Sequence, residues 1–367
     1  MVLKKQEMIL NMGPQHPSTH GVFRAVLTLD GENIIELKPH IGYLHRGVEK
    51  IAENRTYLQF IPYTDRLDYV SAMFNNWVYV KAVEELAGIE VPERAEYIRV
   101  IVAELNRIAS HLVFLTTAGL DTGALTPFFY FFSDRDRILD LFEEISGARL
   151  TYNYLRFGGV KNDINKKFIE GTKDLIKYLR SKIDEYENLL LRNYIFLERT
   201  KGIGILSTDL ALEYGVSGPV LRASNFNWDL RKDEPYSVYE KFDFNITIGK
   251  NGDCWDRYWV RLEEIRQSLN ITEQAIDSLP AGDFKTKGVP LMLKPPKGEI
   301  YTHIESPRGE QGVYINSDGS EKPYRLKWRS PAYANLSILP EMAKGSQIPD
   351  LVVIIGSLDP VFGEVDR

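Results

Sequence analysis

The stretch that decides the fold is residues 91–112, VPERAEYIRVIVAELNRIASHL. Pro92 is suited to the first turn of a helix, since proline there gives up no helical hydrogen bond. Apolar residues then recur every three or four positions, at Ile98, Ile101, Val102, Leu105, Ile108 and Leu112. This spacing predicts a helix with one buried stripe.

Helical patterns continue on both sides of this stretch and make the interior mostly α. Each is marked by apolar periodicity and by Ser, Gly or Pro at its ends. The predicted helices are residues 48–86 with a break at Pro62, 134–145 between Ser133 and Gly147, 174–198, and 255–279 before Pro280.

Strand patterns flank the helical region. Residues 22–29 and 34–37 are joined through Asp30-Gly31, and a later set, 299–304, 312–316 and 324–328, contains a second Asp-Gly turn at Asp318-Gly319. We therefore expect an α+β protein in which a central helical bundle is bracketed by β-rich segments. The predicted parts are residues 1–46, a β-rich segment with a functional loop; 47–288, the helical core; and 289–367, a β-rich segment with a cavity-lining tail.

Composition excludes several classes of protein. The 367 residues carry a net charge of −6 and a single cysteine, Cys254, so an internal disulfide or a metal held by several thiolates cannot be built. The longest apolar runs, residues 125–132 and 351–355, are too short to cross a bilayer. Residues 1–7 do not read as a secretory signal, and we expect a cytosolic chain. There is no basic block of the kind that binds nucleic acid.

Histidines cluster near the start of the chain, where His16, His20, His40 and His45 are four of the six. A zinc site on His16 and His20 is disfavoured because prolines and glycines around them predict a loop and no third ligand is nearby. These histidines could be ordinary turn residues. A Gly- and Pro-pinned loop carrying a group that titrates near neutral pH also suits a proton donor.

Other catalytic and nucleotide motifs are absent from the sequence. There is no Gly-x-Ser-x-Gly, and Gly202-Ile203-Gly204 lacks the later glycine and the acidic partner of a dinucleotide site. We therefore expect no binding of NAD or ATP by this chain.

Seven motifs carry a resemblance to a known family over nearly the whole chain. They are residues 13–17 (GPQHP), 39–47 (PHIGYLHRG), 66–69 (RLDY), 120–129 (LDTGALTPFF), 156–160 (RFGGV), 221–224 (LRAS) and 359–367 (DPVFGEVDR). The sequence resembles the D subunit of the bacterial proton-pumping NADH:quinone oxidoreductase (complex I). That family is similar to the large subunit of nickel–iron hydrogenases, whose four metal-binding cysteine positions fall here on Arg46, Glu49, Val361 and Glu364. The resemblance implies a hydrogenase-like fold, no metal bound by this chain, and an emptied cavity that binds quinone.

The resemblance also assigns residue roles. It places quinone between His20 and Tyr69, makes Asp121 the acidic partner of His20, lines the cavity with Val361, and sets Arg46 beside the [4Fe–4S] cluster of the B subunit. Phenol and imidazolium groups can each donate a proton to a quinone oxygen, and Asp121 is expected to keep His20 charged until the quinone is reduced. On the residues alone, Tyr69 would be a packing aromatic, Asp121 a turn or cap residue, Arg46 a surface ion-pair partner and Val361 a buried valine.

The implied activity is reduction of quinone within respiratory complex I, coupled to proton translocation. The chain would lie at the cytoplasmic side of the cell inner membrane as a peripheral protein, with the B, C and H subunits and other subunits of both arms as partners. The alternatives are the equivalent subunit of a complex fed by ferredoxin or reduced deazaflavin, and a non-catalytic hydrogenase-like scaffold. Two departures from the family are Thr151, where many members carry a histidine, and a short Pro/Gly/Lys connection before Lys297 in place of a helical segment.

Overall fold

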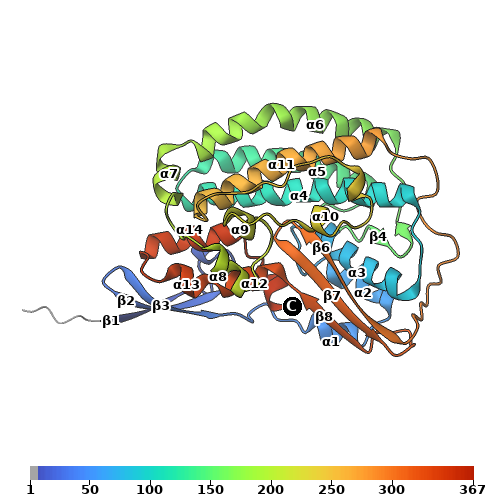
Figure 1. Ribbon diagram of the computed structural model, residues 1–367, viewed down its shortest axis with the longest axis horizontal. Coiled ribbons are helices and arrows are strands. Elements are labelled where there is room, and N and C mark those ends of the chain that lie inside the picture. The colour runs from blue at the N-terminus through green and yellow to red at the C-terminus, as the bar shows by residue number, and fades with distance from the viewer. Residues whose placement is uncertain (1–6) are drawn as a thin grey trace, which may run out of the picture.

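The computed structural model describes residues 7–367 and mixes helices with small antiparallel sheets, which confirms the α+β prediction (Figure 1). The first six residues, which belong to the stretch expected not to be a secretory signal, lie outside the described residues. The three-part division of the chain stays a prediction. Side chains from both three-stranded sheets and from the helices pack into one continuous apolar core.

The N-terminal sheet has the order β1-β2-β3 and extends from one end of the molecule (Figure 1). Strands β2 (Arg24–Asp30) and β3 (Asn33–His40) form the predicted hairpin, with Leu27 opposite Leu37. The sequence did not indicate β1 (Glu7–Met12), which pairs along the other edge of β2. The loop from β1 to β2 carries His20 on a 3₁₀ turn, Pro17–Thr19.

Three helices follow: α1 (Val48–Ala52), α2 (Tyr57–Thr64) and α3 (Ala72–Ala87). The predicted break at Pro62 is wrong, because Pro62 lies inside α2. Helix α2 begins at a side-chain cap, and α3 begins after a turn that a buried carboxylate holds. Thr56 forms a capping box at the start of α2, and the Asp68 carboxylate accepts the backbone N–H groups of Val70 and Ser71 just before α3.

Helices α4 (Glu93–Asp121), α5 (Leu125–Ser146), α6 (Lys166–Tyr186) and α11 (Cys254–Asp277) form a layer above the sheets (Figure 1). Helix α4 packs against both α5 and α11. The predicted stripe on α4 is buried, but so are its polar positions from Arg99 to His111, so the central part of α4 is buried on all sides.

Three predicted boundaries in this layer are wrong: the start of α5 and both ends of α6. Helix α5 begins at Leu125, with Pro127 in its first turn, and runs through Ser133; its end at Gly147, which has a positive φ of 80°, was predicted correctly. Helix α6 begins early because Asn165 caps the N–H of Phe168. It ends at Tyr186, where a π turn (Glu187–Leu191) leads into α7 (Tyr194–Thr200).

The remaining elements connect the helical layer to the second sheet. The short hairpin β4 (Leu155–Arg156) and β5 (Gly159–Val160) lies after α5, and α8 (Thr208–Glu213), α9 (Gly218–Ala223) and α10 (Leu230–Asp233) precede α11. The predicted C-terminal strands are confirmed as β6 (Gly298–Ser306), β7 (Gly309–Ser317) and β8 (Arg325–Arg329). Four helices that no pattern indicated complete the chain: α12 (Pro331–Ser337), α13 (Leu339–Ala343), α14 (Ile348–Leu358) and α15 (Phe362–Asp366).

Within residues 7–367, no helix combines the length and the apolar character needed to span a bilayer.

Candidate functional site

A cavity of about 190 Å³ brings together residues that are far apart in the sequence. Its walls come from the β1–β2 loop, the turn before α3, the last turns of α4, the β6–β7 turn, and the end of α14. We call it the His20 pocket; its lining is His20, Tyr69, Val70, Val113, Phe114, Thr117, Arg308, Gly356, Asp359, Pro360 and Val361. Three of the predicted site residues, His20, Tyr69 and Val361, therefore share one cavity.

His20 is held in the left-handed region, with φ of 56°, at the end of the 3₁₀ turn. A non-glycine residue in this region is uncommon and directs the side chain away from the path of the neighbouring strands. Its Nε2 lies 3.2 Å from Oδ2 of Asp121, the last residue of α4. The two side chains are only 11% and 9% exposed, so the expected partner of His20 is present and shielded from water.

Gly356 of α14 makes this close packing possible. A Cβ added there would lie 2.5 Å from Asp121 Oδ2 and 3.0 Å from His20 Nε2. Both distances are shorter than ordinary contacts, so only glycine fits without moving the pair. No sequence pattern marked Gly356, because the requirement comes from the packing of α14 against the loop and α4.

Tyr69 lies in the turn between α2 and α3, and its side chain is 43% exposed. Partial burial raises the pKa of Tyr69, and the neighbouring charge of Asp68 raises it further. The phenol is therefore protonated at neutral pH and available as a hydrogen-bond donor in the pocket.

Arg308, which no sequence pattern indicated, forms ion pairs with two carboxylates on the inner side of the pocket. Its Nη1 donates to Asp68 Oδ2 at 2.6 Å and its Nη2 to Asp359 Oδ1 at 3.2 Å. Burial opposes the charge of Arg308, but Asp359 and Asp68 raise its pKa. Burial raises the pKa of Asp359, against the lowering effect of Arg308 and Arg261. Since Arg308 lies in a two-residue turn of a hairpin, the sequence alone favours an exposed side chain there, and nothing in it signals this buried ion cluster.

The four positions onto which the resemblance places metal-binding cysteines have different environments. Arg46 is exposed, and its Nη2 donates to the carbonyl of Arg66 at 2.7 Å. Glu49 forms an ion pair with Lys327 at 3.0 Å. Val361 is buried in the wall of the His20 pocket. Glu364 is fully buried, and this burial raises its pKa to about 8.

The segment that contains Arg46 and the segment that contains Val361 and Glu364 both contact the turn that follows α2. Gly363 of α15 lies so close to the carbonyl of Leu67 that an added Cβ would be 2.7 Å from it. The neighbouring Arg66 is the residue to which Arg46 is bonded. In the described part of the chain, no group of three His, Cys, Asp or Glu residues is arranged to hold a metal ion. His16 instead accepts the N–H of Ser18 through Nδ1 at 3.2 Å.

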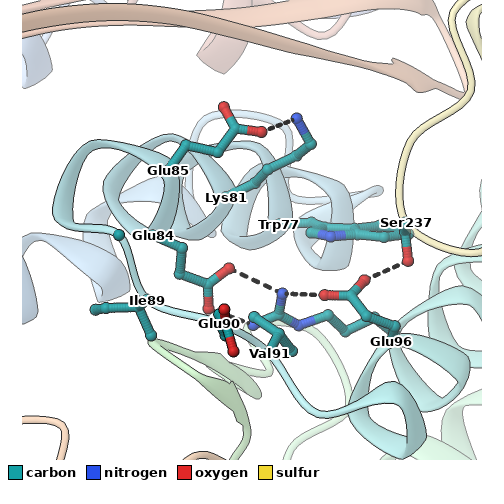
Figure 2. A pocket seen from close by; sticks show the side chains of 11 residues that line it. Trp77, Lys81, Glu84, Glu85, Ile89, Glu90, Val91, Glu96 and Ser237 are labelled. Atoms are coloured by element: carbon teal, nitrogen blue, oxygen red, sulfur yellow. Dashed lines mark hydrogen bonds and ion pairs between the residues drawn. The ribbon is translucent and has the colours of Figure 1, made fainter.

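A second cavity, of about 460 Å³, lies at the end of α3 beside the start of α4 (Figure 2). Its inner carboxylates are already paired. Glu84 and Glu96 both accept from Arg99, at 2.6 and 3.1 Å, while Glu85 pairs with Lys81. These contacts join α3 to α4 and have a structural explanation.

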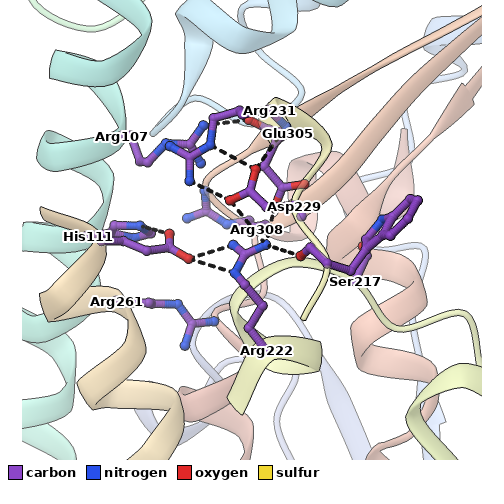
Figure 3. Close-up of polar contacts among 12 residues, drawn as sticks. Arg107, His111, Ser217, Arg222, Asp229, Arg231, Arg261, Glu305 and Arg308 are labelled. Atoms are coloured by element: carbon purple, nitrogen blue, oxygen red, sulfur yellow. Dashed lines mark hydrogen bonds and ion pairs between the residues drawn. The ribbon is translucent and has the colours of Figure 1, made fainter. Parts of the chain in front are cut away.

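A buried ionic network crosses the interface between α4, α11 and β6 (Figure 3). Arg222 bonds Glu264 at 2.5 Å and Glu305 at 2.8 Å, and Arg231 bonds Asp229 at 2.6 Å. Burial lowers the pKa of His111 to about 4, so His111 is neutral at pH 7 beside Glu264. Each of these carboxylates has a guanidinium partner, which offsets the cost of burying its charge. Arg261 differs, because within residues 7–367 its guanidinium donates only to the carbonyls of Arg257 and Ser357.

The fold and the His20 pocket together define a mixed helix-and-strand protein that presents an imidazole and a phenol beside a buried ion-pair cluster. The family model described as respiratory-chain NADH dehydrogenase, 49-kDa subunit, matches residues 121–295 and 286–367. The chain belongs to this family, which confirms the resemblance drawn from its motifs.

Full-length relatives agree with this assignment. The chain is 56% identical over 366 residues to a protein of Desulforamulus reducens, and 54% identical over 365 residues to one of Bacillus anthracis, with the whole of both chains covered in each comparison. It is 53% identical to a protein of Clostridium beijerinckii, covering all of this chain and 98% of the relative. Each relative is named as the D subunit of an NADH-quinone oxidoreductase.

Proposed function

We propose that this chain is the quinone-binding catalytic subunit of respiratory complex I, the NADH:quinone oxidoreductase. The observation that carries the proposal is the convergence of His20, Tyr69 and Val361 on one pocket, with Asp121 3.2 Å from His20. Membership of the family and the names of the relatives indicate the reaction, which is the reduction of quinone by NADH.

The pocket residues suit the proton chemistry of quinone reduction. A quinone that accepts two electrons also takes up two protons to become a quinol, one on each carbonyl oxygen. Tyr69 donates one from its phenol and His20 donates the other from its imidazolium. Loss of these protons leaves a phenolate, a neutral imidazole and an Asp121 carboxylate without its partner. We infer that this freed charge starts the signal that couples reduction to proton translocation by the membrane subunits.

The electrons come, in this proposal, from the terminal [4Fe–4S] cluster of the B subunit. Arg46 is exposed and so can face a neighbouring polypeptide, where its fixed positive charge would favour the reduced cluster. The C and H subunits and the other subunits of the two arms complete the assembly. The chain is then a peripheral protein at the cytoplasmic side of the cell inner membrane.

We also infer that the pocket descends from a nickel–iron hydrogenase cavity. Val361 stands at a former cysteine position and lines the His20 pocket, and Glu364, at another, is buried close by on α15. Apolar and neutral side chains at these positions leave room for an organic substrate and offer no thiolate to a metal.

Conservative substitutions in the assembled complex test the site. Tyr69→Phe removes the phenol O–H and keeps the ring, while Asp121→Asn keeps the shape and removes the charge. Both should leave the complex assembled and lower quinone reduction by roughly 10²- to 10⁴-fold, the usual contribution of a positioned proton donor. Tyr194→Phe, at an exposed tyrosine of α7, is the matched control. Full turnover in both variants would remove the site assignment and favour a non-catalytic scaffold.

The identity of the electron donor distinguishes complex I from the related complex that is fed by ferredoxin or reduced deazaflavin. The purified complex should reduce quinone with NADH. Turnover with reduced ferredoxin or deazaflavin and none with NADH would instead assign the chain to the related complex.

A further inference from the structure

A third cavity, which shares no lining residue with the His20 pocket, lies between α2 and the connection that precedes β6. It has a volume of about 680 Å³. Its lining includes Leu58 and Pro62 of α2, Arg156 and Phe157 of the β4–β5 hairpin, and residues 285–291. We call it the 285–291 groove. It includes the short Pro/Gly/Lys connection that sets this sequence apart from many members of its family.

Part of the groove is preformed, because residues 284–286 are hydrogen-bonded to the hairpin through one antiparallel bridge between Gly159 and Lys285. Val160 N–H donates to the Phe284 carbonyl at 3.1 Å, and Thr286 N–H donates to the Gly158 carbonyl at 2.7 Å. Gly159 permits this approach, since a Cβ there would lie 2.3 Å from the Phe284 carbonyl oxygen. A partner would therefore meet Arg156 and Lys285 on segments that are already held together.

The groove is positively charged in a chain whose net charge is negative. Arg156, Lys285 and Lys287 line it, and no Asp or Glu is among its described lining residues. Lys287 has an ion pair with Asp283 at 3.2 Å, but both side chains are well exposed, so this pair is weak. Anions that enter the groove would meet cations from two segments, the β4–β5 hairpin and residues 285–291.

Arg156 gives a second reason to expect an anionic partner. Its guanidinium donates to the side-chain amide oxygen of Asn153, a neutral acceptor. Burial lowers the pKa of Arg156, against the raising effect of Asp65, so its charge is only partly compensated within the chain. Carboxylates are the usual bidentate partners of such a guanidinium.

Exposed apolar side chains adjoin these cations. Leu291 is 79% exposed and Met292 is 60% exposed, while the neighbouring Val289 is half-buried in the groove wall. Exposed apolar side chains beside the cations of a groove are typical of a protein-binding surface. Arg66, which donates to the Pro62 carbonyl, extends the positive charge to Arg46 and thus toward the face that we assign to the B subunit.

We propose that the 285–291 groove binds an acidic segment of a neighbouring polypeptide, with carboxylates on Arg156, Lys285 and Lys287 and an apolar side chain against Val289 and Leu291. The inference rests on the proposed function, because a subunit that works only inside an assembly needs such surfaces. A polypeptide is favoured over a lipid bilayer because Arg156 is partly buried within the groove, where a planar surface cannot reach it.

Zero-length carbodiimide crosslinking of the intact complex tests the proposal directly. We expect isopeptide bonds between Lys285 or Lys287 and an Asp or Glu of another subunit, identified by mass spectrometry. We also expect loss of labelling of these two lysines by an amine reagent in the complex, compared with the isolated full-length chain. The double variant Lys285→Glu/Lys287→Glu should lose the crosslink and co-purify with less of the crosslinked subunit.

The control is Lys166→Glu/Lys167→Glu, which makes the same change in charge at exposed positions at the start of α6 and should co-purify normally. Equal labelling of Lys285 and Lys287 in both states, or crosslinks only to Asp283 of the same chain, would overturn the proposal. So would protection of the isolated chain by inorganic phosphate alone, or protection that disappears when lipid is removed from an otherwise intact complex. None of these measurements depends on quinone turnover, so a Tyr69→Phe complex should keep the crosslink, and the two proposals fail separately.

Discussion

Gly356→Ala tests whether the contact between His20 and Asp121 matters for turnover without changing either residue. The added Cβ would lie 2.5 Å from Asp121 Oδ2, whereas ordinary contact begins at 3.4 Å. The carboxylate must therefore retreat by about 0.9 Å, a distance that follows from these two values. Since the pair is 3.2 Å apart, a retreat of this size away from His20 lengthens the contact beyond hydrogen-bonding distance.

The expected loss is large for so small a change. Misplacement of a catalytic group by about 1 Å can lower a rate by about 100-fold, which corresponds to about 2.7 kcal/mol of transition-state stabilisation. Alanine is also the better helix former by about 1 kcal/mol, so weakening of α14 itself would not explain the loss. The assay is quinone reduction by the purified complex, normalised to the amount of assembled complex.

A matched glycine gives the control. At Gly298 an added Cβ would have Leu86 Cδ1 at 3.9 Å as its nearest neighbour, so Gly298→Ala should keep full turnover. If Gly356→Ala keeps full turnover as well, the geometry of the His20–Asp121 pair does not limit the reaction, and our account of the pocket is wrong. If Gly356→Ala prevents assembly, Asp121→Asn carries the test in its place.

Two further predictions concern stability and are measured by chemical unfolding of the isolated chain. Arg308→Met should lower the free energy of unfolding by about 3–5 kcal/mol, because it leaves Asp68 and Asp359 buried without their shared cation; Arg325→Met, which removes an exposed partner of Glu53, should cost less than about 1 kcal/mol, and equal losses would contradict this reading. Burial raises the pKa of Asp65 from its ordinary 3.8 to about 7, so the folded state binds a proton that the unfolded state has lost, and stability that is fully present below pH 4 should fall by up to about 4 kcal/mol as the pH rises through 7. Asp65→Asn should flatten this decline, whereas the exposed Asp209→Asn should not; an unchanged pH profile in Asp65→Asn would show that the carboxyl is not held neutral.

The helices and strands that were predicted correctly have signals contained within a few residues. The α4 stripe, the Asp30-Gly31 hairpin and the β7–β8 hairpin all follow from local periodicity and turn chemistry. The errors came where a side chain or distant packing overrides a local signal. Pro62 lies inside α2, which begins at the Thr56 capping box and ends at Thr64, and α5 begins at Leu125 and not at Ser133.

The residues of the candidate site also fall into those that the sequence indicated and those that only the structure revealed. Tyr69, Asp121 and Val361 could be named from the ordered motifs in which they occur, and His20 from the loop that continues the first motif; the family comparison confirms the resemblance that those motifs indicated. Their roles stay predictions. Arg308 and Gly356 could not be named, because a turn arginine and a helical glycine acquire their importance only from what packs against them.

The sequence by itself determined the α+β class, the family and the absence of enough cysteines for a thiolate-held metal, because composition and ordered motifs are properties of the chain. Only the tertiary structure decided that residues 20, 69 and 361 line one small cavity together with Arg308, and that Asp121 contacts His20 there. Those contacts join segments up to several hundred residues apart. They depend on how α4, α14 and the β1–β2 loop pack, and no local pattern of residues encodes that packing.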